Sequence, residues 1–240
     1  MAIGPDRRYM TAAQADAAQI DVGLRQYMLR VYQYMAGGLA LTGAVALYVA
    51  NSPAALNAIF GTPLAWVVML APLGFALMFG FRIHKMTAGT AQMLFWAFAA
   101  VMGLSLSLIF VRFTGESIAR TFFITGGTFA AMSLYGYTTK RDLSGFGSFL
   151  FMGLIGLILA SVVNIFLGST ALQFAISVIG VLVFTGLTAY DTQRIKEMYA
   201  EYDAADVGVK KAILGAFMLY LDFINLFVYM LQFLGVARSE

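Results

Sequence analysis

The sequence predicts an all-α integral membrane protein, and three observations support this fold class. Of the 240 residues, 61% are hydrophobic and 11% are charged, whereas about 25% of a soluble domain is charged. Only helices and closed barrels satisfy their backbone hydrogen bonds in lipid. Uncharged runs of 18 residues or more are typical of membrane helices, not of the alternating strands of a barrel. The bilayer is therefore the solvent in which these elements pack.

Composition also excludes several classes of site. The chain has no cysteine, so it has no disulfide and no thiolate metal site. A single histidine, His84, rules out a multi-histidine metal site within one chain. The net charge of +3 is better explained by loop topology than by nucleic-acid binding, so we expect no nucleic-acid partner.

Residues 1–28 are the only long polar segment. We interpret them as a cytosolic tail in which Thr11 caps a short alanine-rich helix. The first apolar run begins too late and is too long for a cleavable signal peptide. The predicted domains are thus the tail, 1–28, and a transmembrane domain, 29–240.

Seven crossings account for the remaining chain. The first helix ends at Asn51-Ser52-Pro53, and the second tolerates an internal Pro72. Residues 143–190 carry no charge over 48 positions, which is too long for one crossing of about 20 residues. The break falls at Gly168-Ser169-Thr170. The predicted helices are 31–50, 64–81, 89–111, 121–137, 147–167, 171–193 and 211–234, with a charged loop from Arg194 to Lys211.

Lysine and arginine in the short loops predict the orientation. Twelve of them fall on one side of the seven-helix scheme and three on the other. This bias places the amino terminus in the cytoplasm and the carboxyl terminus outside, in what we expect to be a bacterial inner membrane. The three on the outer side are Arg112, Arg120 and Arg238.

A weak internal repeat relates three helix ends. The segment FGFRIHK at 79–85 resembles YGYTTKR at 135–141, and a fainter copy, YDTQR, lies at 190–194. The repeat places Arg82, Thr138 and Asp191 at equivalent inner ends. Three helical hairpins then leave the last helix as the odd element at the centre.

The last predicted helix carries a polar stripe on an otherwise apolar surface. At 100° per residue, its polar and small residues fall within a sector of roughly 100°. A carboxylate at mid-membrane costs about 2.5–3.5 kcal/mol and normally faces a bundle interior. The alternative is that the stripe only joins helices through hydrogen bonds. The stripe consists of Lys211, Gly215, Met218, Asp222, Asn225, Tyr229 and Gln232.

Asp191 and Asp222 are the two carboxylates of the predicted spans, and they can meet if the sixth helix continues past Tyr190. Two adjacent carboxylates in a poor dielectric share one proton, which makes the pair a candidate pH sensor. The repeat places Arg82 at the depth of Asp191, so an Arg82–Asp191 ion pair is a candidate latch. The alternatives are that Asp191 caps a helix end and that Arg82 is only a positive anchor at the headgroups.

Two carboxylates suit a hard cation, calcium above all, or protons. We expect transient calcium contact at Asp191 and Asp222, with Asn225 and Tyr229 lining the outer continuation of the path and no cofactor. Enzyme chemistry is not favoured, because the chain has no HExxH, GxSxG or phosphate-loop motif. An aspartyl intramembrane protease would have glycine around its second aspartate, whereas Leu221 and Phe223 flank Asp222.

The segments TAYDTQRI at 188–195 and LYLDFINLF at 219–227 resemble the paired motifs of the Bax inhibitor-1-like family, bacterial branch. VYQYMAGGLALTG at 31–43 is similar to the family's first helix, and the likeness covers about 25–235. The resemblance implies six helices around a central seventh and a pH-sensitive calcium leak. Its two sensor aspartates correspond to Asp191 and Asp222, and its gating arginine to Arg82 on a looser motif. The longer loop at 197–209 is a departure from the family.

Two other functions remain open. Some bacterial relatives are associated with membrane-anchored AAA proteases, so the chain could be an interaction partner without transport, regulated through its 1–28 tail. A proton-coupled carrier would show saturable counter-transport.

Overall fold

The computed structural model describes residues 12–238, with side chains over 22–238 except at residue 84. The predicted cap at Thr11 lies outside the described residues. Within them the chain is helical, and one isolated antiparallel bridge joins Phe113 to Ala237. The elements are α1 (Ala12–Ala50), α2 (Pro53–Phe60), α3 (Leu64–Arg82), the 3-10 turn η2 (Ile83–Lys85), α4 (Ala88–Arg112), α5 (Gly115–Thr138), α6 (Ser144–Leu167), α7 (Thr170–Glu197) and α8 (Ala205–Leu234).

Local sequence explains where the helices begin and end. Thr87, Thr114 and Ser169 cap α4, α5 and α7, because each side-chain oxygen accepts a backbone N–H of the first turn. Gly168 ends α6 with a left-handed φ of 59°, a conformation that costs glycine little. The break predicted at 168–170 is therefore a tight turn between two antiparallel helices.

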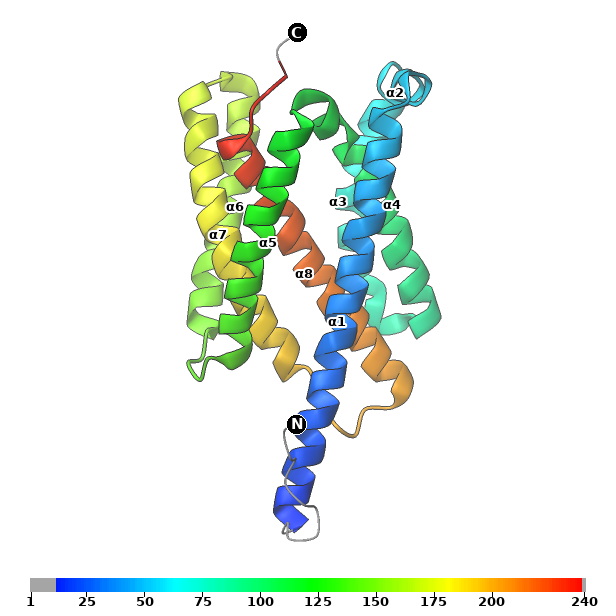
Figure 1. Ribbon diagram of the computed structural model, residues 1–240, viewed down its shortest axis with the longest axis vertical. Helices are drawn as coiled ribbons and strands as arrows, with labels where there is room; N and C mark the ends of the chain where they lie inside the picture. The colour runs from blue at the N-terminus through cyan, green and yellow to red at the C-terminus, as the bar shows by residue number, and fades with distance from the viewer. Residues whose placement is uncertain (1–11, 239–240) are drawn as a thin grey trace.

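Six helices are long and apolar enough to cross a membrane: α1, α3, α4, α6, α7 and α8. The less apolar α5 has 24 residues, about 36 Å at 1.5 Å per residue. It also runs along the bundle, packed against α7 and α8. Figure 1 shows that the described chain begins at one end of the bundle and that α8 finishes at the other.

The C-terminal helix α8 is the most buried of the six apolar helices, with 67% of its most apolar window buried. It packs against α1, α4, α5 and α7, while α3 packs on α4 and α6 packs on α7. Four of the six helices predicted to surround α8 therefore contact it extensively. Figure 1 shows α8 crossing obliquely behind α1 and α5.

Several helix boundaries differ from the sequence prediction. The predicted boundary at residue 28 falls inside α1, and α2 was not predicted. The charged loop is shorter than predicted, because α7 continues to Glu197 and α8 begins at Ala205. Charged residues do not end a helix that has reached the headgroups, where water solvates them. The pairs Lys211–Asp203 (2.6 Å) and Lys210–Asp206 (3.2 Å) lie at this end of α8.

Candidate functional site

The polar stripe of α8 faces α7, its antiparallel neighbour. Gly215 lies against Ile195, where an added Cβ would be 2.8 Å from the isoleucine side chain. At the other end, Gln232 accepts a hydrogen bond from Gln173 at 2.9 Å and one from Ser177 at 3.3 Å. The helix therefore turns its polar groups away from lipid, as the cost of exposing them there requires.

Asp191 of α7 and Asp222 of α8 meet midway along this seam. Their carboxyl groups lie close enough to influence each other's charge. Asp222 is 4% exposed, and Asp191 is partly buried. No described residue donates to Oδ2 of Asp222. Two ionised carboxylates can only accept hydrogen bonds, so a hydrogen bond between these two acids would need a proton on one of them.

Close backbone packing holds α7 in this position. Gly136 of α5 lies directly against the backbone of Ala189, where an added Cβ would be 2.9 Å from the carbonyl carbon. Such a contact is possible only without a side chain at 136. Ala189 is two residues before Asp191, so this contact sets how deeply the acid-bearing turn of α7 enters the bundle.

A chain of hydroxyl groups also ties α7 to α5 and α1. Tyr32 lies 2.6 Å from Ser133, Ser133 lies 2.9 Å from Thr192, and Thr192 donates to the carbonyl of Thr188 at 2.7 Å. Since Thr192 donates to a backbone carbonyl, Ser133 donates to Thr192 and Tyr32 donates to Ser133. The chain ends at that carbonyl and does not reach the carboxyl pair, so it joins three helices and does not conduct protons. Sequence analysis missed it.

Arg194, three residues along α7, is the charged side chain whose field acts on Asp191. Lys196 is turned to α5, where it donates to the carbonyl of Tyr137 at 2.9 Å and lies over its ring. The predicted Arg82–Asp191 ion pair is absent among the described residues. Arg82 is exposed at the end of α3, a helix that packs mainly on α4. The repeat predicted that Arg82 and Asp191 lie at the same depth in the membrane, but α3 does not pack against α7.

The two predicted pore-lining residues lie on the α8 stripe but do not border an open path. The ring of Tyr229 stacks on Phe184 with centroids 5.7 Å apart. It also lies against Gly180, where a Cβ would be 2.6 Å from the ring. Asn225 donates to the carbonyl of Leu221 on its own helix at 2.8 Å. The part of the α7–α8 seam between the carboxyl pair and Gln232 is therefore filled by side chains.

The metal prediction rests on two carboxylates. Among the described side chains, no group of three or more His, Cys, Asp or Glu residues could hold a metal ion. Calcium takes six to eight oxygen ligands, so Asp191 and Asp222 alone do not complete its coordination. The geometry suits a passing cation or a shared proton better than a resident metal.

The fold and the carboxyl pair define a helical integral membrane protein with two acids buried between neighbouring helices. The chain belongs to the Bax1-I family, described as inhibitor of apoptosis-promoting Bax1, whose model matches residues 24–239. This confirms the resemblance drawn from the two aspartate motifs.

Three relatives match nearly the whole chain. An uncharacterized protein of Rickettsia prowazekii is 53% identical over 91% of this chain and 93% of its own length. Inner membrane protein YbhL of Escherichia coli K12 is 51% identical over 90% of this chain and 94% of its own length. An uncharacterized protein of Caulobacter vibrioides is 47% identical over 98% of both chains.

Proposed function

We propose that this protein is a pH-sensitive calcium leak of the bacterial inner membrane, with Asp191 and Asp222 as its proton sensor. The observation that carries the proposal is the contact between the two carboxyls within the bundle. The family supports it, and the name of the Escherichia coli relative supports the location. The lysine and arginine bias supports a cytoplasmic amino terminus and an outer carboxyl terminus.

Protonation changes the net charge of the Asp191–Asp222 pair inside the helix bundle, where a charge is costly. With one shared proton the pair carries a single negative charge, which Arg194 on the same helix partly offsets. Loss of that proton leaves two carboxylates in contact, and their repulsion favours separation of α7 and α8. A second proton removes the charge that attracts a cation. The proton count therefore couples helix separation to the attraction of calcium.

The structure represents the closed state in this proposal. Tyr229 and Phe184 fill the outer seam, and separating α7 from α8 would expose Asn225 and Tyr229 to the path. Arg82 enters as a latch only if a second state brings it to Asp191.

The test is calcium flux into proteoliposomes across a pH series. We expect pH-dependent flux for the wild type and loss of that dependence in Asp191→Asn and Asp222→Asn, because asparagine keeps the shape without the proton. Glu116→Gln is the matched control, since Glu116 is an exposed acid paired with Arg120 at 2.9 Å. Unchanged pH dependence in both asparagine variants contradicts the sensor.

Two further results separate the alternatives. If Arg82→Ala shifts the pH midpoint of calcium flux, the result supports the Arg82–Asp191 latch. An unchanged midpoint removes Arg82 from the mechanism. Absence of calcium flux at every pH would contradict the leak and favour an interaction partner, such as a modulator of a membrane-anchored AAA protease.

A further inference from the structure

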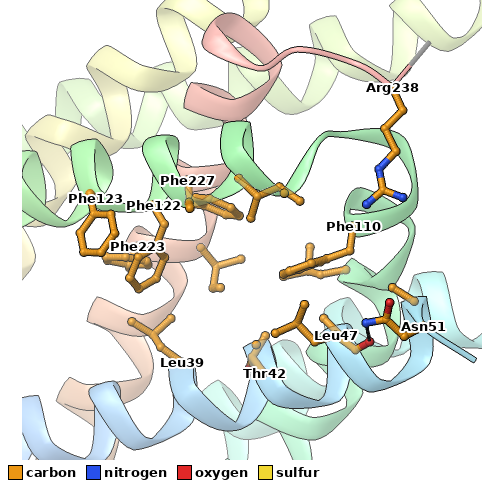
Figure 2. A pocket seen from close by; sticks show the side chains of 18 residues that line it. Leu39, Thr42, Leu47, Asn51, Phe110, Phe122, Phe123, Phe223, Phe227 and Arg238 are labelled. Carbon is orange, nitrogen blue, oxygen red and sulfur yellow. Dashed lines mark hydrogen bonds between the residues drawn. The ribbon is translucent and has the colours of Figure 1, made fainter.

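A cavity of about 420 Å³ lies in the outer half of the bundle, between α1, α4, α5 and α8. It is separate from the α7–α8 seam, because it borders the opposite face of α8. Figure 2 shows apolar side chains from four helices around it, among them Leu39, Phe110, Phe122 and Phe227. An apolar space of this size is in the range of small-molecule pockets.

The cavity opens sideways towards the bilayer. Its walls on α1 and α5 include Leu47, Phe122 and Phe123, which are 49%, 44% and 75% exposed. These two helices do not pack extensively on each other. An apolar space that opens into hydrocarbon favours an acyl chain over water, because water there would lose its hydrogen bonds.

One cationic side chain lies at the mouth. Nε of Arg238 donates to the carbonyl of Phe113 at 3.1 Å, and Figure 2 shows its guanidinium pointing to the cavity near Phe110. The segment after α8 fixes this position through Arg238 N–H to Arg112 (2.9 Å) and Val236 N–H to Ser117 (2.9 Å).

The other polar groups of the lining are already satisfied. The hydroxyl of Thr42 donates to the carbonyl of Ala99 at 2.8 Å, and the amide of Asn51 donates to the carbonyl of Leu47 at 2.9 Å. The guanidinium Nη groups of Arg238 have no hydrogen-bond or ion-pair partner among the described residues. The cavity therefore combines an apolar interior with one anion-binding group at its rim.

We propose that this cavity binds one acyl chain of an anionic phospholipid whose phosphate pairs with Arg238. If each chain carbon takes about the volume of one water molecule in the liquid, roughly 30 Å³, then 420 Å³ accommodates about fourteen carbons, which is one chain and not two. The sideways opening lets the second chain remain in the bilayer. A guanidinium whose Nη groups have no partner among the described residues can bind phosphate oxygens through paired hydrogen bonds. The site is independent of the proposed calcium leak.

The test is photolabelling of the full chain in phosphatidylcholine bilayers. The probe is phosphatidylglycerol with a diazirine in one acyl chain, and labelled peptides are mapped by mass spectrometry. Matched arms use phosphatidylcholine and a free fatty acid with the same diazirine. We expect phosphatidylglycerol to label segments 42–47 and 223–227 about tenfold more than phosphatidylcholine.

Two variants test the two halves of the site. Gly43 lines the cavity, and an added Cβ there meets nothing within 4 Å, so Gly43→Leu fills the space and should reduce labelling to background. Its control is Gly74→Leu on α3, also unobstructed. Arg238→Gln should abolish the preference for phosphatidylglycerol, while Arg120→Gln should not.

Three outcomes overturn the proposal. They are undiminished labelling of Gly43→Leu, equal labelling by the two phospholipids in the wild type, and stronger labelling by the fatty acid than by phosphatidylglycerol.

Discussion

Substitution of Gly136 by alanine should displace α7 where it carries Asp191. The new Cβ would lie 2.9 Å from the carbonyl carbon of Ala189 and 3.0 Å from its Cα. The carbonyl oxygen of Ala189 lies closer still to this Cβ position, and carbon atoms pack best at about 3.5–4.0 Å, so the two backbones must separate by about 1 Å or more. The obstacle is main chain, so no side-chain rotation relieves it.

The cost follows from these distances. Overpacking costs about 1–3 kcal/mol, and we expect the upper value because only a helix shift relieves the contact. Alanine in a helix gains about 1 kcal/mol over glycine, which leaves a net loss of about 2 kcal/mol. At Gly127 on the same helix, an added Cβ meets nothing within 4 Å. Gly127→Ala should therefore gain about 1 kcal/mol, so the two variants should differ by about 3 kcal/mol.

Unfolding by SDS in mixed micelles, followed by the fluorescence of Trp66 and Trp96, measures this difference. The same proteins in the calcium-flux assay should show altered pH dependence for Gly136→Ala and wild-type behaviour for Gly127→Ala. Equal stability of the two variants would refute the close-packing argument. A destabilised Gly136→Ala with unchanged pH dependence would refute the link between this contact and the carboxyl pair.

Three further predictions concern hydrogen bonds. Thr192→Val removes the hydroxyl that accepts the hydrogen bond of Ser133 and should lower the free energy of unfolding by about 1–3 kcal/mol in the same assay. Thr192→Ser keeps this acceptor and should have nearly the wild-type stability. Thr42→Val leaves the buried hydroxyl of Tyr220, 2.6 Å away, without a partner and should cost more than Tyr220→Phe, which should lose only about 0.5–1.5 kcal/mol. The side chain and the backbone N–H of Ser144, at the start of α6, both hydrogen-bond to Asp142 and lower the pKa of its carboxyl. Acidification through that lowered pKa should reduce the protection of the first α6 amides from hydrogen exchange, after correction for the intrinsic pH dependence of exchange, and Asp142→Asn should remove this change; protection that stays constant with pH in the wild type would contradict it.

The meeting of Asp191 and Asp222 could be predicted because lipid restricts where a carboxylate can lie. A stripe of polar residues on an apolar helix must face a neighbouring helix, and α7 was the neighbour with an acid of its own. The prediction needed α7 to continue past Tyr190, and the structure extends it to Glu197.

Features that depend on helix rotation and splay could not be predicted in the same way. Tyr32, Ser133 and Thr192 come from three helices, and nothing in their spacing indicates that they meet. The position of Arg82 was predicted from the internal repeat. A repeat indicates how deep a residue lies in the membrane but not which neighbouring helix it faces. The cavity between α1, α4, α5 and α8 arises where α1 and α5 do not pack extensively on each other, and the hydrophobic pattern of either helix alone does not encode that spacing.

The burial of α8 also has a consequence for biogenesis. Domains fold during synthesis from the amino terminus onwards, and α8 follows the other described helices along the chain. The membrane helices that precede it are therefore made before the helix on which α1, α4, α5 and α7 pack. Until α8 has been made, its position must be occupied by lipid, by a chaperone or by a looser arrangement of the earlier helices. Loss of the codons for α8 would thus remove the element that completes the bundle.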